Sequence, residues 1–330
     1  MAAFLEERKM HSPIPSMSSA KRRSLLRRAA WLCAALVLVV ISLSAFLRQS
    51  NAGLGCTPWP ACHGRAALGE SPPEAAGPAQ RGARAVHRVT ASSLLVLLLG
   101  MAALAWIPRP RADSEGRQIL LALGLVLFLA VLGPFTSGSR VPAVTLGNLL
   151  GGLVLFAVCV RLALRPSPRQ APTGPPLGRW AWAALVLLLL QMALGGLISA
   201  GYAGLSCPQL LGCRPAAESW QALDPRQVPG AGAGLPQYAG GVGAQWLHRL
   251  GALAVLAAVL ALALVAWRAG RRKAATALAA LVALQTEVGI VLALGSLPLG
   301  VALAHNLLAA LLLAAVATLL PRTRALSPGL

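Results

Sequence analysis

Two sets of chemically active residues recur along the chain in the same order. Each set has a cysteine pair six positions apart, followed by a His-Arg pair where an apolar run begins. The first set is Cys56, Cys62, His87 and Arg88, and the second set is Cys207, Cys213, His248 and Arg249. Internal repeats determine the architecture of a chain. Thiols and imidazoles that recur within an apolar chain indicate buried redox or heme chemistry.

A second histidine accompanies His248 in the later half of the chain. His305 lies about a turn and a half into the last apolar run, and the alternation of membrane spans puts both imidazoles in the outer half of the bilayer. Two imidazoles at similar depth suit the two axial positions of a heme iron. Arg249 then stands where a heme propionate would pair with it. The alternative is two unrelated histidines that hydrogen-bond across helices.

The first half keeps His87 but has no partner histidine. Asn148 occupies the position that matches His305, and a shift of one residue places Gly147 there instead. The iron of a heme in this half would have His87 as its one protein ligand, with a weak or open sixth position. A substrate heme tolerates that arrangement, and a decayed site looks the same, so both interpretations stay open.

The four loop cysteines allow three disulfide connectivities. We expect pairing within each loop, Cys56 with Cys62 and Cys207 with Cys213, because each bond closes a short loop. A structural role is the simpler interpretation, and a redox role for Cys56–Cys62 is the alternative. Zinc binding is disfavoured, since paired zinc ligands usually have two to four residues between them.

Other polar groups have plainer interpretations. His11 in the basic tail is expected to be solvated, and His63 in the first outer loop is either a ligand or, by preference, a surface histidine. Glu287 is the one carboxylate inside an apolar run, where it either relays protons or packs against a buried polar group. Cys33 and Cys159 fall inside apolar runs and are expected to be packed core thiols.

The elements that must position these residues are membrane-spanning helices. The chain has 330 residues, of which 57% are hydrophobic and 12% charged, whereas a soluble domain has about a quarter charged residues. A helix needs about 20 apolar residues to cross a bilayer, where its backbone must satisfy its own hydrogen bonds. Eight runs qualify: roughly 29–47, 86–107, 118–135, 142–164, 180–201, 246–267, 274–295 and 299–320.

The eight runs divide into two halves with the same plan. The sequence predicts an all-α membrane protein in which two tandem four-helix bundles are related by a pseudo-two-fold axis along the membrane normal. The predicted parts are a basic cytoplasmic tail (1–28), an N-terminal bundle (29–165), a Pro-rich linker (166–179) and a C-terminal bundle (180–330). The longest loops follow the first and fifth runs and carry the cysteine pairs.

The net charge of +20 is distributed along the chain as in a membrane protein. Most of the Lys and Arg residues lie in the N-terminal tail and in alternate loops, which places both termini in the cytoplasm. Anionic lipid headgroups are a sufficient partner for the basic tail, and no nucleic acid is expected. The first run follows a basic segment and has a signal peptide as its alternative interpretation, but it matches the fifth run in the repeat.

These motifs resemble the heme A synthase family over nearly the whole chain. The matching segments are RQSNAGLGC (48–56), WPACHG (59–64), YAGLSC (202–207), WLHR (246–249) and AHN (304–306). The resemblance implies stepwise oxidation of a ring methyl of heme O to a formyl group, for terminal oxidase biogenesis in a bacterial inner membrane. The heme O synthase that supplies the substrate and oxidase assembly factors are the implied partners.

The resemblance also implies roles for individual residues. A bound heme b has His248 and His305 as iron ligands, with Arg249 beside them. The substrate heme O lies in the first half with His87 as its iron ligand, and the implied catalytic residues are His87, Arg88, Arg48, Cys56 and Cys62.

Two departures from the family pattern fall in that catalytic half. Asn148 stands where the family usually has a histidine, and Arg84 stands where it usually has a glutamate. Glu70 and Glu74 are the nearest carboxylates. The runner-up interpretation is therefore a non-catalytic heme-binding paralogue that acts in electron transfer or oxidase assembly. A transporter is a weaker alternative, because the apolar runs offer few polar residues to line a path.

Overall fold

The computed structural model describes residues 18–54, 56–70, 77–108, 111–136, 139–164, 175–210 and 212–321. His11 and Glu74 lie outside these residues. The described chain is helical and contains no strand. Its α-helices are α1 (Ser19–Asn51), α2 (Ala61–Leu68), α3 (Pro78–Trp106), α4 (Asp113–Thr136), α5 (Pro142–Ala163), α6 (Pro175–Ala200), α7 (Val242–Arg268), α8 (Arg272–Leu294) and α9 (Leu299–Thr318), and two short 3₁₀ helices, η1 (Ala217–Leu223) and η2 (Ala239–Gly241), precede α7.

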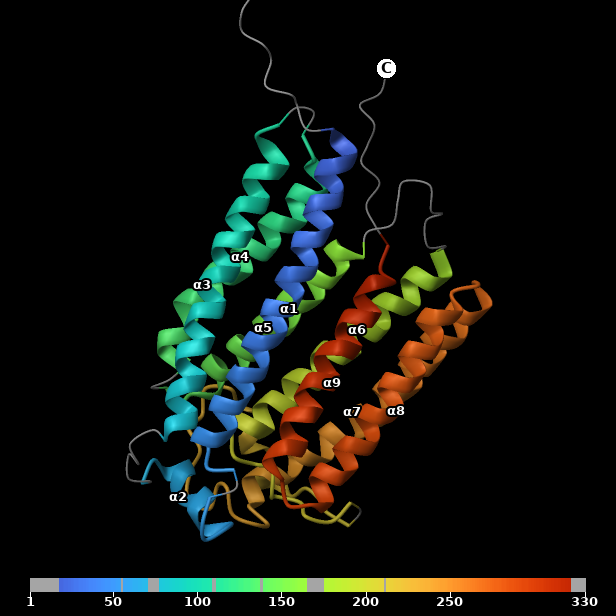
Figure 1. Cartoon of the computed structure of the whole chain (residues 1–330). Coiled ribbons are helices and arrows are strands. Elements are labelled where there is room, and N and C mark those ends of the chain that lie inside the picture. The colour runs from blue at the N-terminus through green and yellow to red at the C-terminus, as the bar shows by residue number, and fades with distance from the viewer. Residues whose placement is uncertain are drawn as a thin grey trace, which may run out of the picture.

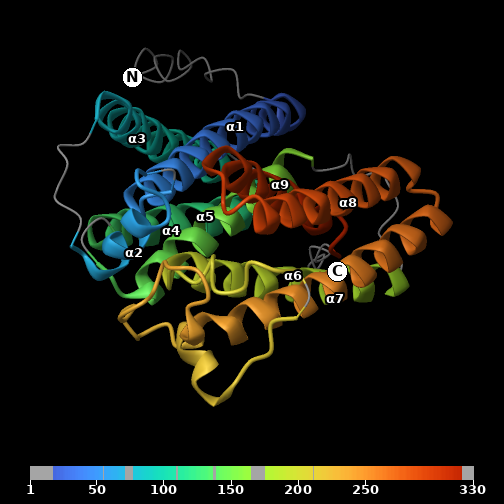
Figure 2. The ribbon, with the colours of Figure 1, turned by 90° about the horizontal axis from the view of Figure 1, so that it is seen from below.

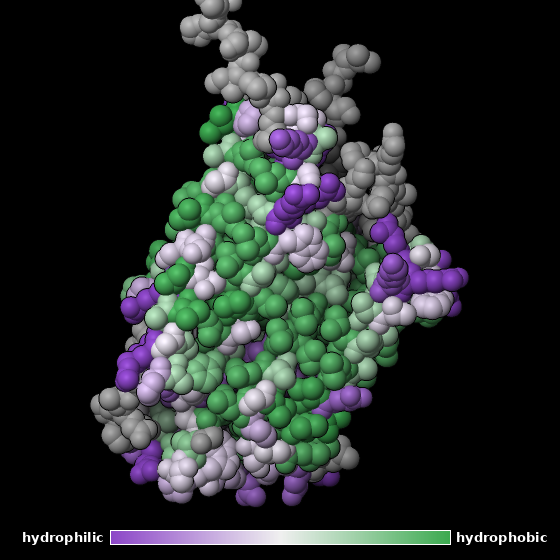
Figure 3. Space-filling view, viewed as in Figure 1, coloured by the Kyte–Doolittle hydropathy of each residue, from purple (hydrophilic) through white to green (hydrophobic). Residues whose placement is uncertain are grey.

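Eight of these helices are long and apolar enough to cross a membrane, which confirms the predicted number of spans. The short α2 lies in the first long loop and was not predicted. Large apolar side chains remain exposed on the outer faces of the spans; Val96 and Val131 are each 68% exposed. Figure 3 shows these surfaces as a mainly hydrophobic middle with hydrophilic residues concentrated toward the ends and edges. Lipid is the solvent that such a surface requires.

Several helices begin earlier than their apolar runs, and the early starts of α1, α3 and α6 change the predicted boundaries most. The Ser18 side chain accepts a hydrogen bond from the Lys21 backbone at 3.3 Å, so α1 includes basic residues that we assigned to the tail. A proline at the first position of α3, where no N–H is needed, starts that helix at Pro78. His87 therefore lies nine residues inside α3 and not at its start. The helix α6 begins at Pro175, within the predicted linker.

The spans pack in two rings of four with the same order (Figures 1 and 2). In the first ring α1 contacts α3, α3 contacts α4, α4 contacts α5, and α5 returns to α1. In the second ring α6, α7, α8 and α9 follow one another in the same way, and α9 returns to α6. Consequently α3 lies diagonally from α5, and α7 lies diagonally from α9. The pseudo-two-fold relation between the rings stays a prediction.

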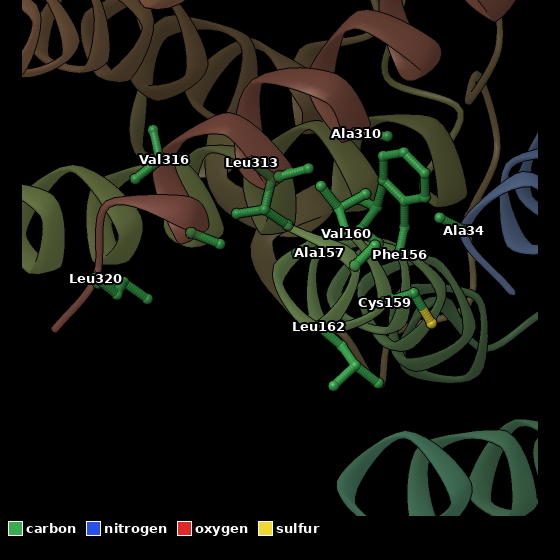
Figure 4. Close-up of a cluster of buried hydrophobic side chains, with 14 of the residues drawn as sticks. Ala34, Phe156, Ala157, Cys159, Val160, Leu162, Ala310, Leu313, Val316 and Leu320 are labelled. Atoms are coloured by element: carbon green, nitrogen blue, oxygen red, sulfur yellow. The ribbon is translucent and has the colours of Figure 1, made fainter. Parts of the chain in front are cut away.

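A single hydrophobic core joins the two rings through α1, α5 and α9. Figure 4 shows the Phe156 ring of α5 close to Ala34 of α1 and Ala310 of α9. At one end of this contact, Arg161 donates hydrogen bonds to the carbonyl oxygens of Ala317 and Pro321, at 3.2 and 2.7 Å. A cation is favourable there because carbonyl groups at a helix C-terminus lack helical partners. The rings are thus packed as one body.

The long loops collect at one end of the molecule. Helix α2 and the segment between α6 and α7 lie at the lower end in Figure 1, whereas α1 begins and α9 ends at the opposite end. Both cysteine pairs therefore lie at the same end of the molecule, opposite the start of α1 and the end of α9, as the repeat predicts. Which end faces the cytoplasm stays a prediction.

Candidate functional site

His248 and His305 occupy equivalent places in the second ring. His248 is six residues after Val242, where α7 begins, and His305 is six residues after Leu299, where α9 begins. At a rise of about 1.5 Å per residue, each imidazole lies about 9 Å along its helix. Both helices start at the loop end, and they are diagonal in the ring. The two histidines therefore share a depth.

A glycine on the neighbouring helix makes room for each imidazole. A Cβ added at Gly195 of α6 would lie 3.0 Å from Cε1 of His248, and one added at Gly289 of α8 would lie 3.1 Å from Cε1 of His305. Contacts this short are tighter than most side chains tolerate. Each imidazole thus packs closely against a glycine of the neighbouring helix, in space that a larger residue would occupy.

A glutamine four residues before each glycine contacts the same histidine. Nε2 of Gln285 lies 3.4 Å from Nδ1 and 3.1 Å from Nε2 of His305. Nε2 of Gln191 donates to the main-chain carbonyl of His248 at 2.8 Å and lies 3.5 Å from the ring Nε2. The two glutamines were not predicted as site residues, although the spacing Gln-x3-Gly occurs in both spans that precede the histidine helices.

Around this pair, several buried polar atoms have no hydrogen-bond partner among the described residues. They are Nδ1 of His248 and the amide oxygens of Gln191 and Gln285. A buried polar group without a hydrogen bond costs about 1–3 kcal/mol, so their gathering at one site needs an explanation. A ligand bound by both imidazoles would explain these buried polar atoms. The residues present fit a heme whose iron is held by two histidines.

Arg249 lies beside His248, but its guanidinium serves the second cysteine loop. It donates to the carbonyl oxygens of Cys207 at 2.6 Å and of Leu210 at 2.8 Å, and also to that of Gln209. Charge-assisted hydrogen bonds are the strong ones in proteins. The structure therefore gives Arg249 a place in holding the loop over α7, and its predicted pairing with a propionate stays untested.

Arg48 extends from the first ring into the second. Its Nη2 donates to Oδ1 of Asn306 at 3.2 Å, and Asn306 is the residue after His305. Its Nε is buried without a partner, and no carboxylate pairs with it among the described residues. A buried cation without a counter-charge is costly. Arg48, predicted for the substrate half, thus contacts the residue that follows His305 in the other half.

The predicted catalytic residues of the first ring are less closely gathered. His87 is half-buried, on the face of α3 that also carries the buried Leu94 and Leu98, whereas Arg84 and Arg88 are exposed. The imidazole of His87 has no hydrogen bond within the described residues. Within the described residues, His87 therefore has no hydrogen bond to Arg48 or to the first cysteine pair.

Asn148 faces a neighbourhood unlike that of His305. Its amide donates to the Ser44 hydroxyl of α1 at 3.4 Å. A Cβ added at the preceding residue, Gly147, would lie 3.1 Å from a methyl carbon of Leu132 in α4. Leu132, four residues before Thr136 near the end of α4, therefore packs against α5 at the residue that precedes Asn148. The surroundings of Asn148 in the first ring thus differ from those of His305 in the second, in addition to the change of residue.

The interpretation of His63 as a surface residue is wrong. Its side chain is 2% exposed, and its Nδ1–H donates to the Ala52 carbonyl at 2.7 Å. Its ring lies between those of Trp59 and Tyr202, with centroids 5.1 and 5.2 Å away. Burial lowers the pKa of His63, while the hydrogen bond opposes this effect. The sequence does not identify His63 as buried, because its burial depends on α2 folding against the loop of the second half.

The remaining predicted residues have the following places. Cys56 is bonded to Cys62 and Cys207 to Cys213. Cys33 and Cys159 are buried free thiols, as predicted. Glu287 is exposed on α8, so the structure gives it no buried polar partner. No group of three or more metal-binding side chains occurs in the described ranges.

We predict that mass spectrometry of the unreduced protein will recover two crosslinked peptides, Cys56 with Cys62 and Cys207 with Cys213. Each pair closes a loop of the same short length, and Arg249 holds the second loop closed. Cys33 and Cys159 serve as internal controls that should be recovered as thiols. Crosslinks between the two loops, or four free loop thiols, would overturn this assignment.

The fold and the site define a class: a multi-pass helical membrane protein with two imidazoles inside one four-helix ring. Residues 84–317 match the COX15-CtaA family, described as cytochrome oxidase assembly protein. The heme A synthase of Shewanella oneidensis is 30% identical over 308 residues, which span 86% of this chain and 92% of that protein. The heme A synthase of Methylobacterium sp. is 29% identical over 357 residues, with 92% and 93% covered.

The heme A synthase of Symbiobacterium thermophilum is 30% identical over 300 residues, with 82% of this chain and 87% of that protein covered. The chain therefore belongs to the COX15-CtaA family of cytochrome oxidase assembly proteins. This membership confirms the resemblance that the cysteine and histidine segments indicated.

Proposed function

We propose that the chain is a heme A synthase, an oxidoreductase that converts a ring methyl of heme O to a formyl group. The observation that carries this proposal is the His248–His305 pair at one depth on diagonal helices, with buried unpartnered polar atoms around it. Similarity to heme A synthases over most of the chain supports it.

In this proposal the two rings have different tasks. The second ring holds a heme b through His248 and His305, which supplies electron-transfer chemistry to the site. The first ring receives heme O near His87, the one histidine that α3 places toward the ring interior. Arg48 lies between the rings and is suited to bind a propionate, because its buried guanidinium lacks a counter-charge.

The surroundings of these sites are also proposals. The loop end faces the oxidising side of a bacterial inner membrane, where disulfides persist, and both termini are cytoplasmic. The substrate is lipophilic and reaches the protein from lipid or directly from the heme O synthase that makes it. The product is passed to terminal oxidase assembly factors.

The test is analysis of the hemes in membranes that contain this chain and heme O. We expect a small formyl heme fraction that grows with time, because proton transfer near His87 has neither a carboxylate from α3 nor a second imidazole. A chain with His87→Ala should form none, whereas a chain with the exposed Arg226→Ala should form as much as the unaltered protein. Membranes with the heme b spectrum but no formyl heme at any time would favour the non-catalytic paralogue.

A further inference from the structure

The two glutamines beside the histidines make different contacts. The amide nitrogen of Gln285 faces the ring of His305 alone, at 3.1 and 3.4 Å from its two nitrogens. The amide nitrogen of Gln191 instead makes its short contact, 2.8 Å, with the main-chain carbonyl of His248. Gly251 of α7 lies against the amide oxygen of Gln191. Only Gln285 is therefore placed to bond to an imidazole as its main partner.

An imidazole that binds iron constrains what its neighbour must offer. One ring nitrogen gives its lone pair to the metal, so the other carries the proton and needs an acceptor. An amide N–H cannot accept that proton, but the oxygen of the same amide can. This oxygen of Gln285 is buried and has no hydrogen-bond partner in the part of the chain that the structure describes. A half-turn of the amide presents it to the ring without moving the helix.

We propose that Gln285 is the positioning residue that orients His305 for the iron and fixes which ring nitrogen carries the proton. This inference rests on the proposed heme b site. Gly289, one turn further along α8, keeps the ring at the distance where the amide reaches it. Gln191 has the matching place beside His248 but holds that residue through its main chain.

The experiment is a redox titration of the full-length protein, purified with its heme b or loaded with ferric protoporphyrin IX. An acceptor on the ring N–H makes imidazole a stronger electron donor and stabilises ferric iron. We expect Gln285→Leu to raise the midpoint potential and Gln285→Glu, which only accepts, to lower it. Both variants should keep the low-spin spectrum of two axial histidines. Gln191→Leu should shift the potential less than Gln285→Leu.

A merely structural role for Gln285 predicts something else, namely heme loss in both variants without shifts of opposite sign. Equal potentials in all three glutamine variants, or shifts of the same sign for Leu and Glu, would overturn the proposal. Gly289→Ala adds a second measurement: it should perturb the low-spin electron paramagnetic resonance signal, whereas Gly124→Ala, in open space, should not. A low-spin spectrum that survives His305→Ala would instead refute the ligand pair.

Discussion

Replacing His305 with alanine should abolish the low-spin spectrum of heme b in the purified protein. The imidazole of His305 is one of two on diagonal helices at the same depth, and no other histidine in the described part of the second ring can replace it. Loss of an outer-shell partner alone costs about 10–100-fold in metal affinity, so loss of the ligand itself should cost more. Optical spectra of the reduced and oxidised protein provide the measurement.

Two control variants separate this loss from unfolding. Asn306→Ala removes the neighbouring side chain, which donates to Ala302 and accepts from Arg48, and should keep the low-spin signal. His63→Ala removes a buried histidine of the loop end and should weaken folding without changing the axial ligands of any heme that remains. A low-spin spectrum of unchanged intensity in His305→Ala would show that the iron ligands lie elsewhere.

Continuous apolar runs were sufficient to predict the spans, because lipid leaves a backbone few alternatives to the helix. They gave less accurate helix starts, since Ser18 and Pro78 begin helices that extend beyond the apolar run. These starts depend on local capping chemistry, and the apolar run only marks where lipid begins. The correction matters for His87, which lies two turns further into its helix than the hydrophobicity indicates.

Contacts between distant segments account for what the sequence did not predict. His63 looks like a loop residue until α2 folds onto the loop that contains Tyr202. Arg48 looks like part of the first half until its guanidinium reaches Asn306 in α9. The contact of Gln285 with His305 depends on the packing of α8 against α9. By contrast, His248 and His305 could be selected as candidate ligands from the sequence, because imidazoles inside apolar runs are rare and costly.

Restoring the missing groups of the first ring should increase formyl heme production. Asn148→His supplies a second imidazole, Arg84→Glu supplies a carboxylate that can move a proton, and Leu132→Gly removes the α4 side chain that packs against Gly147, the residue before position 148. Guanidinium stays protonated and cannot act as a base, and an amide is a poor iron ligand beside imidazole. We expect the triple variant to form product about 100-fold faster, the lower end of what a positioned acid or base contributes.

The structure makes Leu132→Gly the informative member of this set. Leu132 packs against Gly147, directly before position 148, so we expect the pair Asn148→His and Arg84→Glu to gain less than the triple variant, which has more room for the larger imidazole. Leu132→Gly alone should change nothing but stability, because Asn148 still donates to Ser44. Heme extraction and quantification of the formyl product over time decide among these outcomes. Fast conversion by the unaltered chain would mean that His87 needs neither group, and no product from the triple variant would favour the non-catalytic paralogue.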